Sequence, residues 1–88
     1  MQSALRSALD GHRRVTEVRG RGLMVGVELA GVSAAGAVDA CVERGMWVYP
    51  AGSGPAVPDA LLFAPPLTVT DDEVDRIVAI TVDALNAV

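Results

Sequence analysis

Residues 15–29 contain two short apolar segments joined by the sequence Arg-Gly-Arg-Gly, and this stretch restricts the possible folds more than any other. Residues 15–18 alternate apolar and polar side chains, and residues 22–29 are mostly apolar, which is typical of β-strands. The Arg-Gly-Arg-Gly sequence lies between the two strands or within one of them. The chain is therefore expected to contain a β-sheet.

One helix is predicted before these strands and one after them. The first covers residues 2–10 and stops at Gly11, and the second has Ser33 as its N-cap, continues to about Arg44 and ends at Gly45. The side chains expected to face inward are Leu5, Ala8 and Leu9 in the first helix, and Ala34, Ala37, Val38, Cys41 and Val42 in the second.

Two more strands and a final helix are predicted in the rest of the chain. Residues 46–50 and 61–64 form the strands, and residues 51–58 form a loop because they contain two glycines and two prolines. Thr70 and Glu73 have the spacing of a capping box, which begins the final helix. Its apolar stripe consists of Val74, Ile77, Val78, Thr81, Leu85 and Val88. The order α-β-β-α-β-β-α contains no internal repeat and predicts a small α+β domain with a mainly antiparallel sheet and helices packed on it.

The composition limits what the chain can bury and bind. A single domain of 88 residues buries only about 60–65% of the surface that its unfolded chain exposes. Because hydrophobic residues make up 51% of the sequence, we expect some apolar surface to remain as a docking face. The net charge of -4 argues against a general nucleic-acid partner. No signal sequence or apolar run of membrane-spanning length is present, so we expect a cytoplasmic protein with no membrane partner.

Motif by motif, the residues predict no catalytic and no metal site. The glycines at 20, 22 and 26 are spaced one residue too far for the dinucleotide fingerprint, and they precede a strand where that motif needs a helix. Ser53 lacks the spacing of a hydrolase nucleophile. His12 is expected to contact carbonyls at the end of the first helix. Cys41, the only cysteine, is expected to be a buried and inert thiol.

In chain order, several motifs resemble one known family. The segments VTEVRGRGLMVGVEL, ERGMWVYP and LLFAPPLTVTDDEVD, with the helices between and after them, resemble the C-terminal small domain of class III aminotransferases. These are fold-type I enzymes that use pyridoxal 5'-phosphate (PLP). The resemblance covers nearly the whole of residues 1–88, as one domain. Its strongest parts are Arg19-Gly20-x-Gly22-Leu23-Met24 with Glu28, and Pro65-Pro66-Leu67-Thr68 with Glu73 and Asp75.

The resemblance implies structural roles for the Arg-Gly motif. In the family this motif lies at the entry to a strand, so Gly20 and Gly22 are expected to permit a tight turn that side chains would obstruct. Arg19 is expected to make a structural ion pair or hydrogen bond, with a substrate contact as the alternative.

The family's cofactor chemistry belongs to a large domain that precedes the small one. That domain supplies the lysine that binds PLP, whereas all seven basic residues of this chain are arginine. The resemblance therefore implies that the PLP-binding large domain is absent, that the chain is a separated or truncated C-terminal domain, and that it is inactive and binds no PLP alone. The full-length enzyme is expected to be a homodimer that moves an amino group between an amine or amino acid and an oxo acid or aldehyde.

The resemblance also identifies candidate residues at the substrate entrance, namely Tyr49, Ser53 and Gly54. Many members of the family that bind a substrate carboxylate carry an arginine just before the proline of the WVYP segment, or just before the FAPP segment. Here those positions hold Tyr49 and Leu62, which leaves the amino donor and acceptor open. The alternative function is a free-standing α+β interaction domain that docks through an apolar face, with no large domain encoded upstream of Met1.

Overall fold

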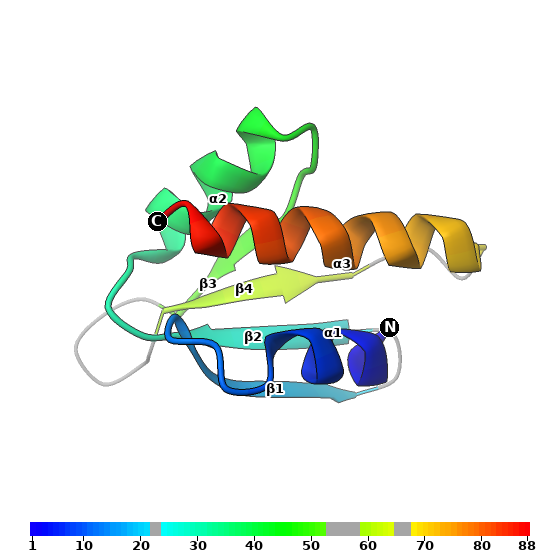
Figure 1. Ribbon diagram of the computed structural model, residues 1–88, viewed down its shortest axis with the longest axis horizontal. Coiled ribbons are helices and arrows are strands. Elements are labelled where there is room, and N and C mark those ends of the chain that lie inside the picture. Colours follow the sequence, from blue (N-terminus) through cyan, green and yellow to red (C-terminus); the bar gives the residue numbers. More distant parts are fainter. Residues whose placement is uncertain (22–23, 53–58, 65–67) are drawn as a thin grey trace.

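The computed structural model describes residues 1–21, 24–52, 59–64 and 68–88 (Figure 1). Its elements are α1 (Gln2–Leu9), β1 (Val15–Arg21), β2 (Met24–Leu29), α2 (Ala34–Glu43), β3 (Tyr49–Ala51), β4 (Ala60–Phe63) and α3 (Asp71–Asn86). This order confirms the predicted α+β fold. Because β1 continues to Arg21, most of the Arg-Gly-Arg-Gly sequence lies within a strand.

The strands form one sheet in the order β1-β2-β4-β3, and every neighbouring pair is antiparallel. The three helices lie together on one face of this sheet (Figure 1). Along β2, Val25, Val27 and Leu29 are buried beneath the helices, whereas Met24, which points to the opposite face, is 50% exposed. This alternation follows from the two-residue period of a strand. Among the described residues, no helix covers the face to which Met24 points.

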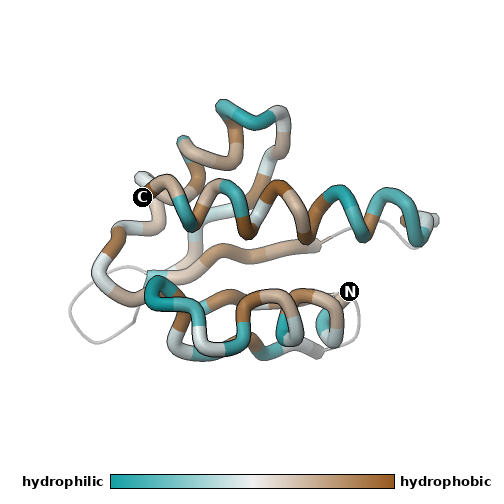
Figure 2. The backbone as a smooth tube through the Cα atoms, viewed as in Figure 1, coloured by the Kyte–Doolittle hydropathy of each residue, from teal (hydrophilic) through white to brown (hydrophobic). Residues whose placement is uncertain are grey.

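Among the described residues, the core between sheet and helices contains one aromatic side chain, Phe63, and is otherwise formed by aliphatic residues with Cys41 and Met46. Its fully buried side chains include Leu5, Leu9, Val27, Leu61 and Leu85. In Figure 2, hydrophobic and hydrophilic residues alternate along the turns of α3, as expected for a helix that covers a sheet with one face only.

Two predicted inward positions are wrong, because each helix is rotated slightly from the expected orientation. Ala8 is exposed, since Leu5 and Leu9 alone anchor the short helix α1. In α2, Val42 is 38% exposed and Ala40 takes its place in the core. The small side chains on the buried side of α2 allow the helix to lie close to α3 and the sheet.

The end of α2 explains why β3 begins later than predicted. Gly45 N donates to Val42 O (2.9 Å), Met46 N donates to Cys41 O (3.0 Å), and Gly45 has a φ of 84°. These are the two hydrogen bonds of a Schellman motif, so Met46 still belongs to the helix end. The strand consequently begins at Tyr49 and includes Ala51, which had been predicted to lie in a loop.

Both predicted N-caps are confirmed. Thr70 Oγ1 accepts from Glu73 N (3.2 Å), and Glu73 Oε1 accepts from Thr70 N (3.1 Å), which completes the capping box of α3. Ser33 Oγ accepts from Gly36 N (3.0 Å) at the start of α2. Side-chain oxygens thus satisfy amides that have no partner within the helices.

Candidate functional site

The sheet face opposite the helices brings together most of the described residues that sequence reasoning selected. Strand register places Arg19, Gly26, Leu62 and Tyr49 in one row across the four strands. The adjacent row consists of Glu17, Glu28, Ala60 and Ala51. We call these eight residues, together with Met24, the open face.

The centre of the open face is hollowed because its residues are small. Gly26 has no side chain, and Ala51 and Ala60 stand beside it, while Arg19 and Leu62 form the rim. The hollow is open and its lining is mainly apolar.

One side of the hollow carries an ion-pair cluster. Arg19 Nη1 donates to Glu28 Oε2 and, at 3.3 Å, to Glu17 Oε2. The hydrogen bond to Glu28 and the charge of that carboxylate raise the pKa of Arg19 above its usual value. The Glu28 side chain is only 17% exposed. The geometry therefore agrees with the structural ion pair expected for Arg19.

Tyr49 lies at the other end of the row and is 66% exposed. Its cross-strand partner is Leu62, so the two positions singled out for carboxylate binding in the sequence analysis are direct neighbours. Cβ atoms of such partners are about 5 Å apart. A guanidinium from either position would consequently reach the same part of the open face.

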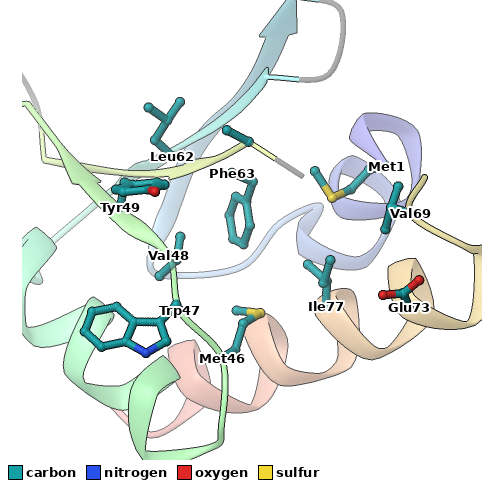
Figure 3. A pocket seen from close by; sticks show the side chains of 11 residues that line it. Met1, Met46, Trp47, Val48, Tyr49, Leu62, Phe63, Val69, Glu73 and Ile77 are labelled. Atoms are coloured by element: carbon teal, nitrogen blue, oxygen red, sulfur yellow. The ribbon is translucent and has the colours of Figure 1, made fainter. Parts of the chain in front are cut away.

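A second cavity, of about 270 Å³, lies between β3, β4 and the start of α3 (Figure 3). Its lining is largely apolar and includes Met46, Phe63 and Ile77. The carboxylate of Glu73 also borders it, but that group accepts hydrogen bonds from Thr70 in the capping box. The one carboxylate named in this mainly apolar lining is therefore already engaged in capping α3.

Gly20 has a different role from the one expected. It lies inside β1, paired with Val25, and not in a turn. A Cβ atom at this position would lie 2.7 Å from Met24 O and 2.9 Å from the end of the Gln2 side chain. A lack of space between β1, β2 and α1, and not a turn conformation, explains the glycine. The other predicted motif and entrance positions (Gly22, Ser53, Gly54, Pro65 and Pro66) lie outside the described residues.

The outer edge of β1 is covered by α1, a feature that sequence reasoning missed. Arg6 Nη2 donates to Val18 O (2.7 Å). With its amide oxygen turned toward the strand, Gln2 accepts from Gly20 N at 3.2 Å. The sequence signal that could have predicted this contact is the presence of the polar residues Gln2 and Arg6 in the first helix.

The predicted contact of His12 with a carbonyl at the end of α1 is made by its backbone, because His12 N donates to Leu9 O (3.0 Å), whereas its ring nitrogens have other partners. Its Nε2 lies 2.7 Å from Asn86 Oδ1, and its Nδ1 accepts from Arg14 N. Arg13 and Arg14 donate to the carbonyl oxygen of Val88. Arg13 and Arg14 therefore place their positive charges at the carbonyl end of α3, where the helix dipole favours them.

Cys41 is fully buried, as predicted, and burial raises the pKa of its thiol. No group of three or more histidine, cysteine, aspartate or glutamate side chains suited to a metal occurs in the part of the chain that the structure describes. Within the same part, no helix combines the length and apolarity needed to cross a membrane.

Comparisons with known proteins agree with this geometry. Residues 1–85 match the family Aminotransferase class-III. The chain is 40% identical over 79 residues to the mitochondrial acetylornithine aminotransferase of Alnus glutinosa, covering 90% of this chain and 16% of that protein. A Bacillus anthracis aminotransferase structure is 26% identical with a TM-score of 0.88, covering 99% of this chain and 22% of that one. The structure of the N-acetylornithine aminotransferase of Stenotrophomonas maltophilia K279a is 30% identical with a TM-score of 0.81, and the match covers 98% of this chain and 23% of that one.

The fold is therefore one that occurs within larger aminotransferases. The chain belongs to the class III aminotransferase family. It spans less than a quarter of the length of each of these three relatives.

Proposed function

We propose that this chain is the C-terminal small domain of a PLP-dependent class III aminotransferase. The complete enzyme moves an amino group between an amine or amino acid and an oxo acid or aldehyde. The observation that carries this proposal is the match of residues 1–85 to the family, supported by the fold shared with two aminotransferase structures. Its partners are the large PLP-binding domain and, in the complete enzyme, a second subunit.

The residues of this chain do not fit the covalent attachment of PLP. The family binds the cofactor through a lysine amine, and all seven basic residues here are arginine. The large domain must therefore supply the cofactor chemistry, and the chain alone is expected to be inactive. The contribution of this chain is to shape the surroundings of the substrate.

The substrate entrance lies at the Tyr49 end of the open face, and Ser53 and Gly54, which follow β3 in the sequence, are further candidates for it. Support comes from the exposure of Tyr49 and from its pairing with Leu62. An apolar side chain and a phenol here offer a substrate carboxylate one hydrogen-bond donor, where an arginine would offer two parallel ones. Substrates without a carboxylate at this end are therefore accommodated.

Borohydride reduction tests the division of labour between the domains. The 88-residue chain mixed with PLP and reduced should carry no stoichiometric adduct on an internal side chain, whereas the complete enzyme should carry one on a lysine outside this chain. Mass spectrometry locates the adduct. Modification of an internal residue of this chain would contradict the proposal. An open reading frame upstream of Met1 that lacks a large domain would instead favour the free-standing interaction domain.

Arginine substitution in the complete enzyme tests the entrance. Tyr49→Arg should raise kcat/KM for a carboxylated amine relative to its decarboxylated analogue by the equivalent of about 1.5–3 kcal/mol, the range for a hydrogen bond to a charged group. Leu62→Arg should act similarly, because the two positions are cross-strand partners. Val42→Arg on the helical side is the control. An unchanged ratio in both folded variants would assign Tyr49 to packing.

A further inference from the structure

The outer edge of β1 carries backbone groups that can pair with another strand. β1 comes first in the sheet order β1-β2-β4-β3, so only one of its two edges pairs with a described strand. Val18 and Gly20 face the other edge, because Val18 O and Gly20 N have their partners in α1. An edge strand of seven residues is a template for the addition of a further strand. An open edge here would make the chain prone to pair with itself or with another extended segment.

Two side chains of α1, which lies beside β1 (Figure 1), close this edge. Arg6 Nη2 donates to Val18 O at 2.7 Å. The amide oxygen of Gln2, turned toward the strand, accepts from Gly20 N at 3.2 Å and from Arg6 Nη2 at 2.9 Å. The buried leucines of α1 hold the helix in this position. A second strand cannot pair with the edge until both side chains release the backbone.

The charges on either side of Val18 indicate that a copy of the same strand fits the edge. In an antiparallel pair with a two-fold axis at Val18, Glu17 lies opposite the partner's Arg19, and Arg19 lies opposite the partner's Glu17. Opposite charges at directly opposed positions stabilise a strand pair. Because Val18 faces outward, it forms the hydrogen-bonded type of pair, and the charged residues form the more closely spaced type. The edge of β1 is therefore complementary in charge to itself.

A two-fold axis at Gly20, the other outward residue, lacks this complementarity. Arg19 would then lie opposite the partner's Arg21, and like charges directly opposite one another destabilise a pair. The axis would also pass through a glycine, which weakens a strand. The charges therefore favour the register centred on Val18.

We propose that the outer edge of β1 is a strand-pairing surface for a second copy of this chain, and that Arg6 and Gln2 hold it closed. Pairing would join the two sheets into one continuous sheet with Val18 of each copy at the junction. Glu17 and Arg19 already contact one another within the chain, so the partner's charges would extend an existing ion-pair cluster. The inference concerns the 88-residue chain itself and does not depend on the proposed function.

Removal of the two α1 side chains tests the closure. The dimer dissociation constant of Gln2→Ala/Arg6→Ala, measured by analytical ultracentrifugation, should be about tenfold lower than that of the unsubstituted chain, because neither copy has to break these hydrogen bonds before pairing. Arg76→Ala, on the exposed side of α3, is the matched control and should leave the constant unchanged. Circular dichroism checks that each variant is folded. If the double variant does not fold, Arg6→Ala alone is compared in the same way. An unchanged dissociation constant in the folded variant would overturn the inference.

Charge reversal tests the partner and the register. Added to the α1 variant, Glu17→Arg places an arginine opposite the partner's Arg19 on both sides of the axis and should raise the dissociation constant about tenfold. Glu43→Arg in α2, where the side chain is 78% exposed, is the same reversal away from the edge and should leave the dimer intact. A dimer that withstands Glu17→Arg, or that Glu43→Arg weakens equally, would show that another surface pairs and would overturn the inference.

Discussion

Alanine at position 20 should destabilise the fold because the new methyl group has no space. Its Cβ would lie 2.7 Å from the backbone oxygen of Met24. Carbon and oxygen in close backbone contacts are about 3.3–3.6 Å apart, so β1 and β2 would have to separate by more than half an ångström. Forcing extra atoms into a packed region costs about 1–3 kcal/mol. The reduced entropy of the unfolded chain offsets about 0.4–1 kcal/mol of this.

The expected net loss is about 1–2 kcal/mol, which corresponds to a fall of about 4–16 °C in melting temperature for a domain of this size. Circular dichroism during thermal and urea unfolding measures it. Gly26→Ala is the matched control in the neighbouring strand, because its Cβ has no contact closer than 3.8 Å with the residues that the structure describes, and it should be neutral or stabilising.

The Gln2 side chain also lies close to position 20, and its contribution can be separated. Gln2→Ala removes the flexible contact at 2.9 Å but leaves the Met24 carbonyl in place. Gly20→Ala should therefore remain destabilising in the Gln2→Ala background. Equal stability of Gly20→Ala and the unsubstituted chain would refute the explanation of this glycine by close strand approach.

Three further substitutions test the core, the helix start and the buried thiol. Thr70→Ala should lower the free energy of unfolding by about 1 kcal/mol through loss of the N-cap, measured by urea denaturation; an unchanged midpoint would contradict this. Leu61→Ala should cost about 2–5 kcal/mol, because the side chain is fully buried in the sheet, and a smaller loss would indicate that the cavity collapses. Because the pKa of Cys41 is raised in the folded state, its contribution to stability is complete below the unfolded pKa of about 8.5 and is lost as the pH rises further; the decline should be shallower in Cys41→Ala.

Local sequence signals predicted the elements well. Thr70 and Glu73 fixed the start of α3, and Gly45 fixed the end of α2, because the atoms that make these hydrogen bonds are only a few residues apart. The inward orientation of Ala8 and Val42 was wrong, since a short helix can rotate to suit the surfaces that it packs against.

The sequence did not allow us to predict which residues lie side by side on the open face. Tyr49 and Arg19 were both selected from the sequence, but their common row depends on the register of three strand pairs. Register is set by contacts between distant segments and by turns, and the spacing of residues along the chain does not determine it. The same reason applies to His12, whose partner Asn86 is 74 positions away.

The contact of residues 12–14 with the end of α3 also affects the order in which parts of the domain can fold during synthesis. Within this domain the first helix and the residues after it are made before α3, although α1 packs against α3 and the partners of His12, Arg13 and Arg14 lie at the end of α3 or just after it. The chain leaves the ribosome at about 5–20 residues per second. Leu5 and Leu9 therefore stay without their final neighbours for several seconds, while the β1–β2 hairpin, whose contacts are local, can already form.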